Sequence, residues 1–323
     1  MRTNSIKRLL IILIISTMVF LPSCVTEKSV IHIGDTPIDN EVFTYYLNAA
    51  IDEMGGKTAS ELIVDAAERV RYYVKVNTLA AKQGIILSQT EKMEISEKLS
   101  GIDAVYGEYY KKIGVSKQAV QKIMESNAYE MALLNAYFGE KGIKAVKNEE
   151  VLKTLNKYFI AFKSVNGYFT KTKENGEITE ISAAEKELLI SEFKDAAKQI
   201  NDKSQTIEEA GTKLQKENAN NTGEITTLKK GSSYYPESFF NQVEKAKANE
   251  AIVVVTDKNV FLVIKEAIKI NGDYFNEHYM YALLKLKGKE LRNLISSDST
   301  YEANVLENKA ADIYNSIIKA RKG

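Results

Sequence analysis

Residues Ala251–Ala267 read AIVVVTDKNVFLVIKEA, and this stretch decides the fold class. Two apolar runs rich in β-branched residues, Ala251–Thr256 and Val260–Ala267, flank the turn-forming sequence Asp257-Lys258-Asn259. That pattern is typical of a β-hairpin. Most other apolar residues of the chain recur at helical spacing. The hairpin therefore predicts a small α+β domain within a mainly helical protein.

The segments before the hairpin complete this small domain. Tyr158–Phe169 is rich in aromatic and β-branched residues and predicts its first strand. Ser182–Glu185 is a capping box, which predicts a helix to about Ile200, and Thr206 can cap a second helix. The expected order from Tyr158 is strand, helix, helix, short turn, helix and the two hairpin strands, over roughly 110 residues.

The polar parts of the same region are expected to be loops, and a proline marks its last helix. The two expected loops are Lys171–Ile181, with Asn175-Gly176 at its centre, and Asn218–Gly223. Pro236 stands where a helix can begin, and the following phenylalanines would form the apolar side of that helix.

The chain before Tyr158 is expected to be helical after a short strand at Val30–Ile33. Asp39 can cap the first helix, and Ser88–Glu91 is a capping box. For the second helix, the residues at helical spacing predict a largely apolar face made of Ile63, Ala67, Val70, Val74, Asn77 and Ala81. The expected helices are about Asn40–Asp52, Ser60–Gln83, Ser88–Lys112, Ser116–Phe138 and Glu149–Lys157.

The last fifty residues return to helical spacing, in Asp273–Leu294 and Ala310–Ala320. A single helix cannot bury its apolar face alone, so these helices are expected to pack on the N-terminal ones. The predicted fold class is α+β, predominantly α. A helical domain formed by residues 24–156 and 272–323 would carry an inserted domain at 157–271.

The first residues have the composition of an export signal. Arg2, Lys7 and Arg8 precede an apolar run, Leu9–Phe20, that is too short to span a bilayer comfortably. Residues 1–23 therefore predict a signal peptide. The ending Leu21-Pro22-Ser23-Cys24 resembles the bacterial lipobox, from which it departs at Pro22, and the resemblance implies lipid attachment at Cys24. The alternative is an ordinary signal peptide beside a chance cysteine.

Composition excludes several classes of function. Lys and Arg number 44 and Asp and Glu 43, and this balance argues against nucleic acid as a partner. The only cysteine is Cys24, and His32 and His278 are far apart in sequence, so no zinc site of His and Cys is expected. The chain has no glycine-rich nucleotide loop and no G-x-S-x-G elbow. We expect no metal and no cofactor.

The order of elements resembles the extracytoplasmic foldases typified by PrsA and SurA. The resemblance begins with Val30–Asp39 followed by Val42–Leu47, which is similar to the strand, turn and first helix of that family. Leu79–Ile85 and Ser88–Glu91 are similar to the family's junction between two helices. The resemblance implies a helical chaperone domain with an inserted parvulin-type prolyl isomerase domain.

The inserted domain departs from the parvulin pattern where that family carries its active-site histidines. Phe159–Val165 holds none, and Phe261 stands at the second expected position. The glycine-rich segment is reduced to Thr222–Ile225, whereas Pro236–Phe240 keeps the P-x-x-F helix. No catalytic residue is therefore assigned, and efficient isomerase activity is not expected. The resemblance assigns peptide binding to four phenylalanines, Phe162, Phe239, Phe240 and Phe261.

These observations favour a membrane-anchored chaperone whose partners are unfolded or partly folded exported polypeptides. Its predicted location is the outer face of the cell membrane, or the outer membrane facing the periplasm. An active isomerase with a rearranged site and a structural, partner-binding lipoprotein are the alternatives, and homodimer formation stays open. Clients would bind in a cleft between the two domains, lined by tyrosines. The candidates are Tyr45, Tyr46, Tyr72, Tyr73, Tyr109 and Tyr110.

Overall fold

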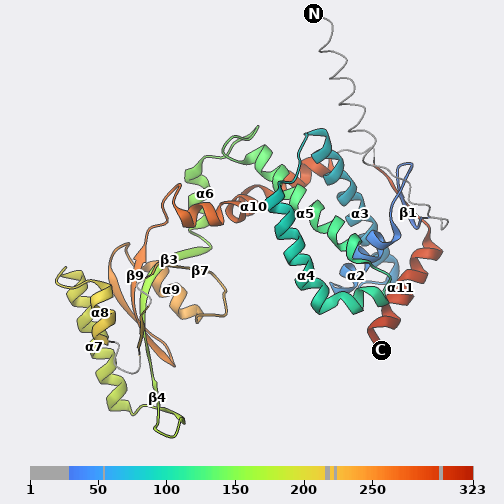
Figure 1. Ribbon diagram of the computed structural model, residues 1–323. Helices are drawn as coiled ribbons and strands as arrows, with labels where there is room; N and C mark the ends of the chain where they lie inside the picture. The colour runs from blue at the N-terminus through green and yellow to red at the C-terminus, as the bar shows by residue number, and fades with distance from the viewer. Residues whose placement is uncertain (1–28, 54, 215–218, 222–223, 298–300, 323) are drawn as a thin grey trace, which may run out of the picture. The chain divides into compact units, whose positions relative to one another are not determined.

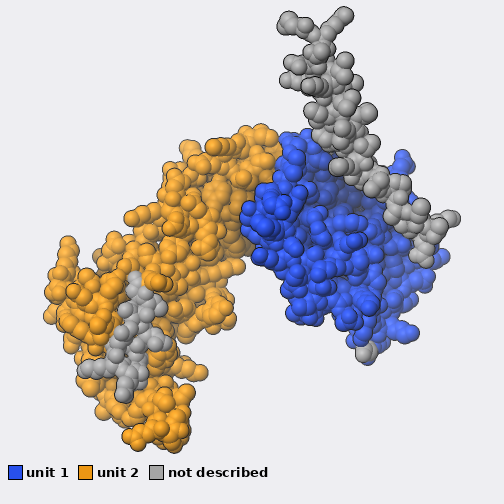
Figure 2. All heavy atoms as spheres, viewed as in Figure 1, with its two compact units in different colours: residues 1–130, 294–323 blue, residues 131–293 orange. Residues whose placement is uncertain are grey.

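The computed structural model describes residues 29–53, 55–214, 219–221, 224–297 and 301–322 (Figure 1). The expected signal peptide (1–23), Cys24 and Thr222-Gly223 lie outside the described residues. The described chain divides into two compact units (Figure 2). Unit 1 contains the described residues up to Glu130 and from Leu294, and unit 2 is Met131–Asn293. The domain boundaries expected at 156/157 and 271/272 stay a prediction.

Unit 1 joins the two ends of the described chain in one small sheet. β1 (Ile31–Ile33) pairs with β2 (Thr36–Pro37) on one side and with β10 (Ala303–Val305) on the other. Both pairings are antiparallel, and Ile31 lies opposite Val305. The sequence did not predict β10, because three residues of mixed polarity carry no recognisable strand pattern.

The helices of unit 1 begin where capping residues place them. Asp39 accepts a hydrogen bond from the Glu41 amide, and Ser88 forms the expected capping box with Glu91. A second capping box, Thr58 with Glu61, was not predicted. The helices with residues in unit 1 are α2 (Asn40–Asp52), α3 (Ala59–Lys82), α4 (Gln89–Lys112), α5 (Lys117–Phe138), α10 (Asp273–Ser296) and α11 (Glu307–Lys322). α5 and α10 continue from one unit into the other.

One hydrophobic core holds unit 1 together, and it includes residues from both chain ends. Ile31 on β1, Phe43 on α2, Leu62 on α3 and Ile317 on α11 are all fully buried in it. α11 packs against α2 and α3. The prediction that the closing helix packs on the N-terminal helices is therefore confirmed for α11.

The buried face of α3 differs from the predicted one. Its buried residues are Leu62, Ala66, Ala67, Val70, Lys75, Val76 and Ala80, and of the predicted set only Ala67 and Val70 are among them. α3 packs against both α2 and α11, so two neighbours determine which side is covered. Asn77 uses its amide to bond the Ser126 hydroxyl at 2.9 Å. Lys75 is buried because its ammonium donates to the Ser296 carbonyl at 2.9 Å.

Unit 2 is built on an antiparallel five-stranded sheet. Its order is β6-β3-β9-β8, and β7 also pairs with β3. The predicted hairpin is confirmed as β8 and β9, and the predicted first strand as β3. The strands are β3 (Phe159–Tyr168), β6 (Ala219–Asn221), β7 (Thr226–Lys229), β8 (Ala251–Val255) and β9 (Asn259–Glu266).

Both segments predicted as loops contain strands. Lys171–Ile181 forms a small hairpin of β4 (Thr170–Thr172) and β5 (Ile178–Glu180), with Gly176 at a positive φ of 83°. Asn218–Gly223 contains β6, and β7 follows it. These short polar strands have no pattern of their own. β6 and β7 form because β3 offers its backbone hydrogen-bonding groups along ten residues.

Helices cover both faces of this sheet. Residues of α7 (Ala183–Asn201) and α8 (Ile207–Leu214) form one core with Val165 and Leu262. Residues of α9 (Glu237–Lys245) form another with Phe162 and Phe261. Side chains alternate between the two faces of a strand, which sorts β3 and β9 into these two cores. The remaining helix of unit 2 is α6 (Asn148–Leu155).

The described elements confirm the predicted fold class, which is α+β and predominantly helical. Gly167 on β3 has a packing role in it, because a Cβ there would lie 2.8 Å from the Phe193 ring of α7. Within the described ranges, no helix is both long and apolar enough to cross a membrane.

Replacing Ile317 with alanine should lower the free energy of unfolding of unit 1 by about 3 kcal/mol, because it leaves a cavity in the shared core. Hydrogen exchange of unit 1 amides would measure the change. Ser316→Ala, at an exposed position of the same helix, is the control and should change stability by less than about 0.5 kcal/mol. An equally small effect of Ile317→Ala would show that α11 is not part of this core.

Candidate functional site

The four phenylalanines assigned to peptide binding lie together on the α9 face of the unit 2 sheet. Phe162 comes from β3, Phe261 from β9, and Phe239 and Phe240 from α9. Ring centroids are 5.2 Å apart for Phe162 and Phe239, and 4.9 Å apart for Phe239 and Phe261. Both pairs are edge-to-face, an arrangement that favours aromatic packing.

These four rings are core residues in the described conformation. Their exposed fractions are 0% for Phe162 and Phe239, 2% for Phe240 and 5% for Phe261. Tyr235, which sequence analysis missed, is half-buried beside them and stacks on Phe239 at 4.5 Å. Burial raises the pKa of the Tyr235 hydroxyl. The sequence feature that could have identified Tyr235 is its position directly before Pro236, where α9 begins. A peptide-binding role for the four phenylalanines stays a prediction.

Neither histidine belongs to a group that could hold a metal. His278 of α10 stacks on Phe159 at 4.2 Å, and its Nε2 lies 3.2 Å from the Thr227 hydroxyl. His32 lies on β1 opposite Pro37 and Asn304. Within the described part of the chain, no three His, Cys, Asp or Glu side chains are grouped as metal ligands would be.

A row of tyrosines joins three helices of unit 1. Successive ring centroids lie 6.2 Å apart for Tyr73 and Tyr46, 5.6 Å for Tyr46 and Tyr45, and 5.8 Å for Tyr45 and Tyr110. α4 adds two more rings near Tyr110, at 6.1 and 6.3 Å. We call this set the tyrosine row. Its members are Tyr45, Tyr46, Tyr73, Tyr106, Tyr109 and Tyr110.

The structure brings together five of the six tyrosines that were expected to line a cleft. The sixth, Tyr72, uses its hydroxyl to bond Glu130 at 2.7 Å. Tyr106, which is 54% exposed, belongs to the row although the sequence did not point to it. It lies four residues before Tyr110 and hence on the same side of α4.

Hydrogen bonds from the C-terminal helix fix one end of the row. The Tyr109 hydroxyl donates to Asn48 Oδ1 at 2.6 Å. Arg321 of α11 donates to the same Oδ1 at 2.7 Å and pairs with Asp52 at 2.7 Å. Burial raises the pKa of Tyr73 and of Tyr110 to about 12. The hydroxyls of Tyr73 and Tyr110 are therefore protonated at neutral pH.

α4 exposes much of its surface, although it is 24 residues long. Its only fully buried residues are Ile95 and Leu99. Met93, Val105 and Tyr106 are 52%, 71% and 54% exposed. An amphipathic helix usually buries an apolar stripe along its whole length. α4 thus presents apolar side chains that the rest of unit 1 does not cover.

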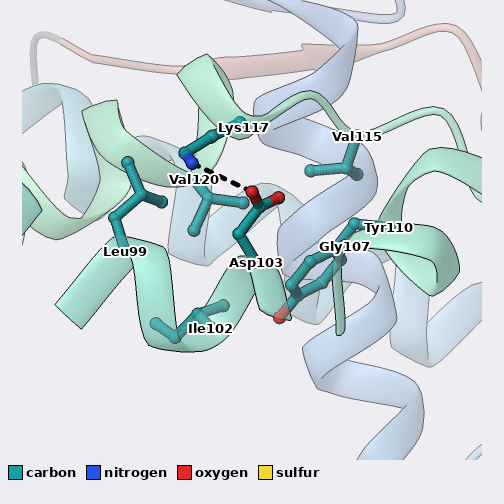
Figure 3. Close-up of a pocket in the computed structure, with 8 residues that line it drawn as sticks. All are labelled: Leu99, Ile102, Asp103, Gly107, Tyr110, Val115, Lys117 and Val120. Atoms are coloured by element: carbon teal, nitrogen blue, oxygen red, sulfur yellow. Dashed lines mark hydrogen bonds and ion pairs between the residues drawn. The ribbon is translucent and has the colours of Figure 1, made fainter. Parts of the chain in front are cut away.

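A small apolar pocket, with a volume of about 20 Å³, lies where α4 meets the start of α5 (Figure 3). An ion pair crosses it, with Lys117 Nζ 2.9 Å from Asp103 Oδ2. Tyr110 of the tyrosine row is one of the lining residues, and a second hollow beside Gly107 includes Val105 and Lys111. We call this pocket, together with the exposed α4 residues Val105 and Tyr106, the α4 surface. The apolar lining is Leu99, Ile102, Val115 and Val120.

The chemistry of the α4 surface suits binding and not bond making. Its aromatic rings offer flat apolar contact with a hydroxyl at one end. Its charged groups balance in number, with Asp103 paired to Lys117 and with Glu108 and Lys111 in the neighbouring hollow. Such a surface can hold apolar or aromatic side chains of another polypeptide without selecting a charge.

These features define a class of protein in which both chain ends form a helical unit and the middle of the chain forms a unit with its own sheet. Similar solved structures are of the foldase protein PrsA. That from Lactococcus lactis is 13% identical, with 90% of this chain and 99% of that chain covered at a TM-score of 0.37. That from Streptococcus pneumoniae is 10% identical, with 84% and 88% covered at 0.33.

A third PrsA structure, from Bacillus subtilis, is 13% identical, with 84% of this chain and 86% of that chain covered at a TM-score of 0.27. No protein-family model matches this chain, and no curated protein matches it.

The free energy of unfolding of unit 1 should fall as the pH rises from about 10 toward about 12. Burial raises the pKa of Tyr73 and Tyr110 from 10.0 to about 12. The folded chain therefore keeps protons that the unfolded chain has released. The stabilisation is complete below pH 10 and is lost as the pH passes through the folded-state pKa. Urea unfolding at a series of pH values would measure it.

Tyr73→Phe removes one of the titrating groups and should reduce this dependence on pH. Tyr234→Phe is the matched control, because Tyr234 is 89% exposed and should leave the dependence unchanged. A slope with pH that is the same in Tyr73→Phe as in the unaltered chain would contradict the assignment.

Proposed function

We propose that this protein is an extracytoplasmic chaperone that binds unfolded exported polypeptides through the α4 surface. The observation that carries the proposal is a long helix whose apolar residues are exposed beside an apolar pocket. Val105 and Tyr106 are exposed there. Val105 lines a hollow beside the pocket, and Tyr106 packs on Tyr110, which lines the pocket itself. Exposed apolar surface of this kind marks sites that bind other proteins.

The proposed mechanism is reversible binding of extended segments rich in apolar and aromatic residues. The rings of the tyrosine row are held in place by packing and by the Asn48–Arg321 contacts. Little side-chain freedom is therefore lost when a client binds. The absence of net charge at the Asp103–Lys117 pair lets clients of varied sequence bind.

Lipid attachment at Cys24 would hold this chaperone at the membrane surface, facing away from the cytoplasm. The support for this part of the proposal is the sequence alone, with its basic start, apolar run and single cysteine. At that location the protein would meet polypeptides as they leave the export machinery.

The α4 surface is tested by the double variant Val105→Asp/Tyr106→Asp, which places two charges among the apolar residues that clients would contact. Suppression of aggregation of an unfolded client, measured by light scattering, should then need several-fold more protein. The matched control is Val64→Asp/Leu188→Asp, because both residues are exposed apolar residues outside the α4 surface. Equal suppression by the two double variants would overturn the proposal.

The second part of the proposal is that the chain lacks efficient prolyl isomerase activity. Rotation about an X-Pro bond has a barrier of about 18–20 kcal/mol, and lowering it needs polar groups placed against the twisted amide. Phe261 offers none, and it lies among Phe162, Tyr235 and Phe239. NMR exchange on a proline tetrapeptide should give the uncatalysed rate at high protein concentration. A clear acceleration would contradict this expectation.

A further inference from the structure

A second pocket lies entirely within unit 2, and its lining is dominated by amides. It has a volume of about 440 Å³ and lies between the end of α5, the start of α6 and the start of α10. Volumes of this size are usual for ligand sites. We call it the amide pocket. Its asparagines are Asn135, Asn148, Asn271 and Asn276.

Asn135, Asn271 and Asn276 are exposed, so their side-chain amides are accessible to a ligand. Asn148 Nδ2 lies 3.4 Å from Glu140 Oε1, and Asn276 Nδ2 lies 3.4 Å from the Asn271 carbonyl. Both distances are at the long end for a hydrogen bond. The Oδ1 atom of Asn148 is buried and has no partner among the described residues. A buried acceptor without a partner is costly, so an N–H donor from a ligand would stabilise it.

The charge of the pocket selects an uncharged ligand. Glu140 and Lys141 are its only charged lining residues, and they carry opposite signs. A site for phosphate or another anion would instead need an excess of cationic groups. The fitting ligand therefore carries hydrogen-bond donors and acceptors in similar number and has no net charge.

Two ligand classes have that chemistry, a peptide backbone and a neutral sugar, and the apolar lining favours the peptide. Phe275 is 2% exposed and meets Tyr279 edge-to-face at 5.6 Å, so its ring face is not open for a sugar to stack on. Met280 lines the same pocket. Its flexible side chain can adapt to different residues of a bound segment.

We propose that the amide pocket binds an extended, uncharged polypeptide segment through its backbone. The asparagine amides would donate to its carbonyls and accept from its N–H groups, because a side-chain amide has the same hydrogen-bonding groups as a peptide unit. The inference rests on the proposed function, in that the client is an unfolded polypeptide. It adds a site that binds the backbone of the client rather than its apolar side chains.

The test uses the full chain and a fluorescent peptide of glycine, serine and threonine, which lacks apolar and charged side chains. Its binding is measured by anisotropy. Asn135→Ala/Asn276→Ala should weaken binding about tenfold, as expected for the loss of two hydrogen bonds. The matched control is Asn293→Ala/Asn315→Ala, because both are exposed helical asparagines that do not line the pocket. It should bind as the unaltered chain does.

A second probe is the same peptide with its backbone amides N-methylated, which should bind about tenfold more weakly because its donors are lost. Equal binding of both peptides, or equal binding by the two double variants, would overturn the proposal. So would a neutral oligosaccharide whose binding is weakened by Asn135→Ala/Asn276→Ala. None of these outcomes alters the aggregation test of the α4 surface, because that test depends on apolar residues of unit 1.

Discussion

The pairing of β1 with β10 is the constraint on which the rest of the structure depends. Ile31 and Val305 lie opposite each other although nearly the whole described chain separates them. The cost of closing such a loop grows only slowly with its length, by about 0.6 kcal/mol for each doubling. A three-residue strand is not stable alone, so the pairing lasts because the helix after β10 enters the same core. Because the ends are joined, the chain that leaves unit 1 after Glu130 must return to it at Leu294.

The returning helix also prepares the surface that we propose binds clients. Arg321 bonds Asn48, and Asn48 in turn holds the Tyr109 hydroxyl. The rings of the tyrosine row are therefore positioned by a residue near the end of the described chain. Val105 and Tyr106 of α4 stay exposed although the start of α5 lies beside the same turns. Stability and exposed apolar surface come from the same arrangement of helices.

In unit 2, unlike on the α4 surface, the phenylalanines of the sheet are buried. The alternation of side chains on β3 and β9 directs Phe162 and Phe261 to the α9 face, where α9 closes over them. The amide pocket, at the junction of α5, α6 and α10, offers polar contacts instead. The two units thus offer different chemistry, with apolar contact in unit 1 and hydrogen bonds in unit 2.

The sequence by itself determined the features that depend on neighbouring residues. Asp39, Ser88 and Ser182 cap helices because each bonds an amide two or three residues away. The hairpin of β8 and β9 follows from its own two apolar runs, and these local patterns were sufficient to predict the mainly helical α+β class.

Only the tertiary structure decided what depends on distant partners. β6, β7 and β10 exist because longer or better buried strands supply their hydrogen bonds. The covered side of α3 was set by α2 and α11 together. Asn135 and Asn276 line the same pocket through packing that leaves no local signal in the chain. Capping and periodicity act within a few residues, whereas burial and pairing depend on which surfaces the folded chain brings together.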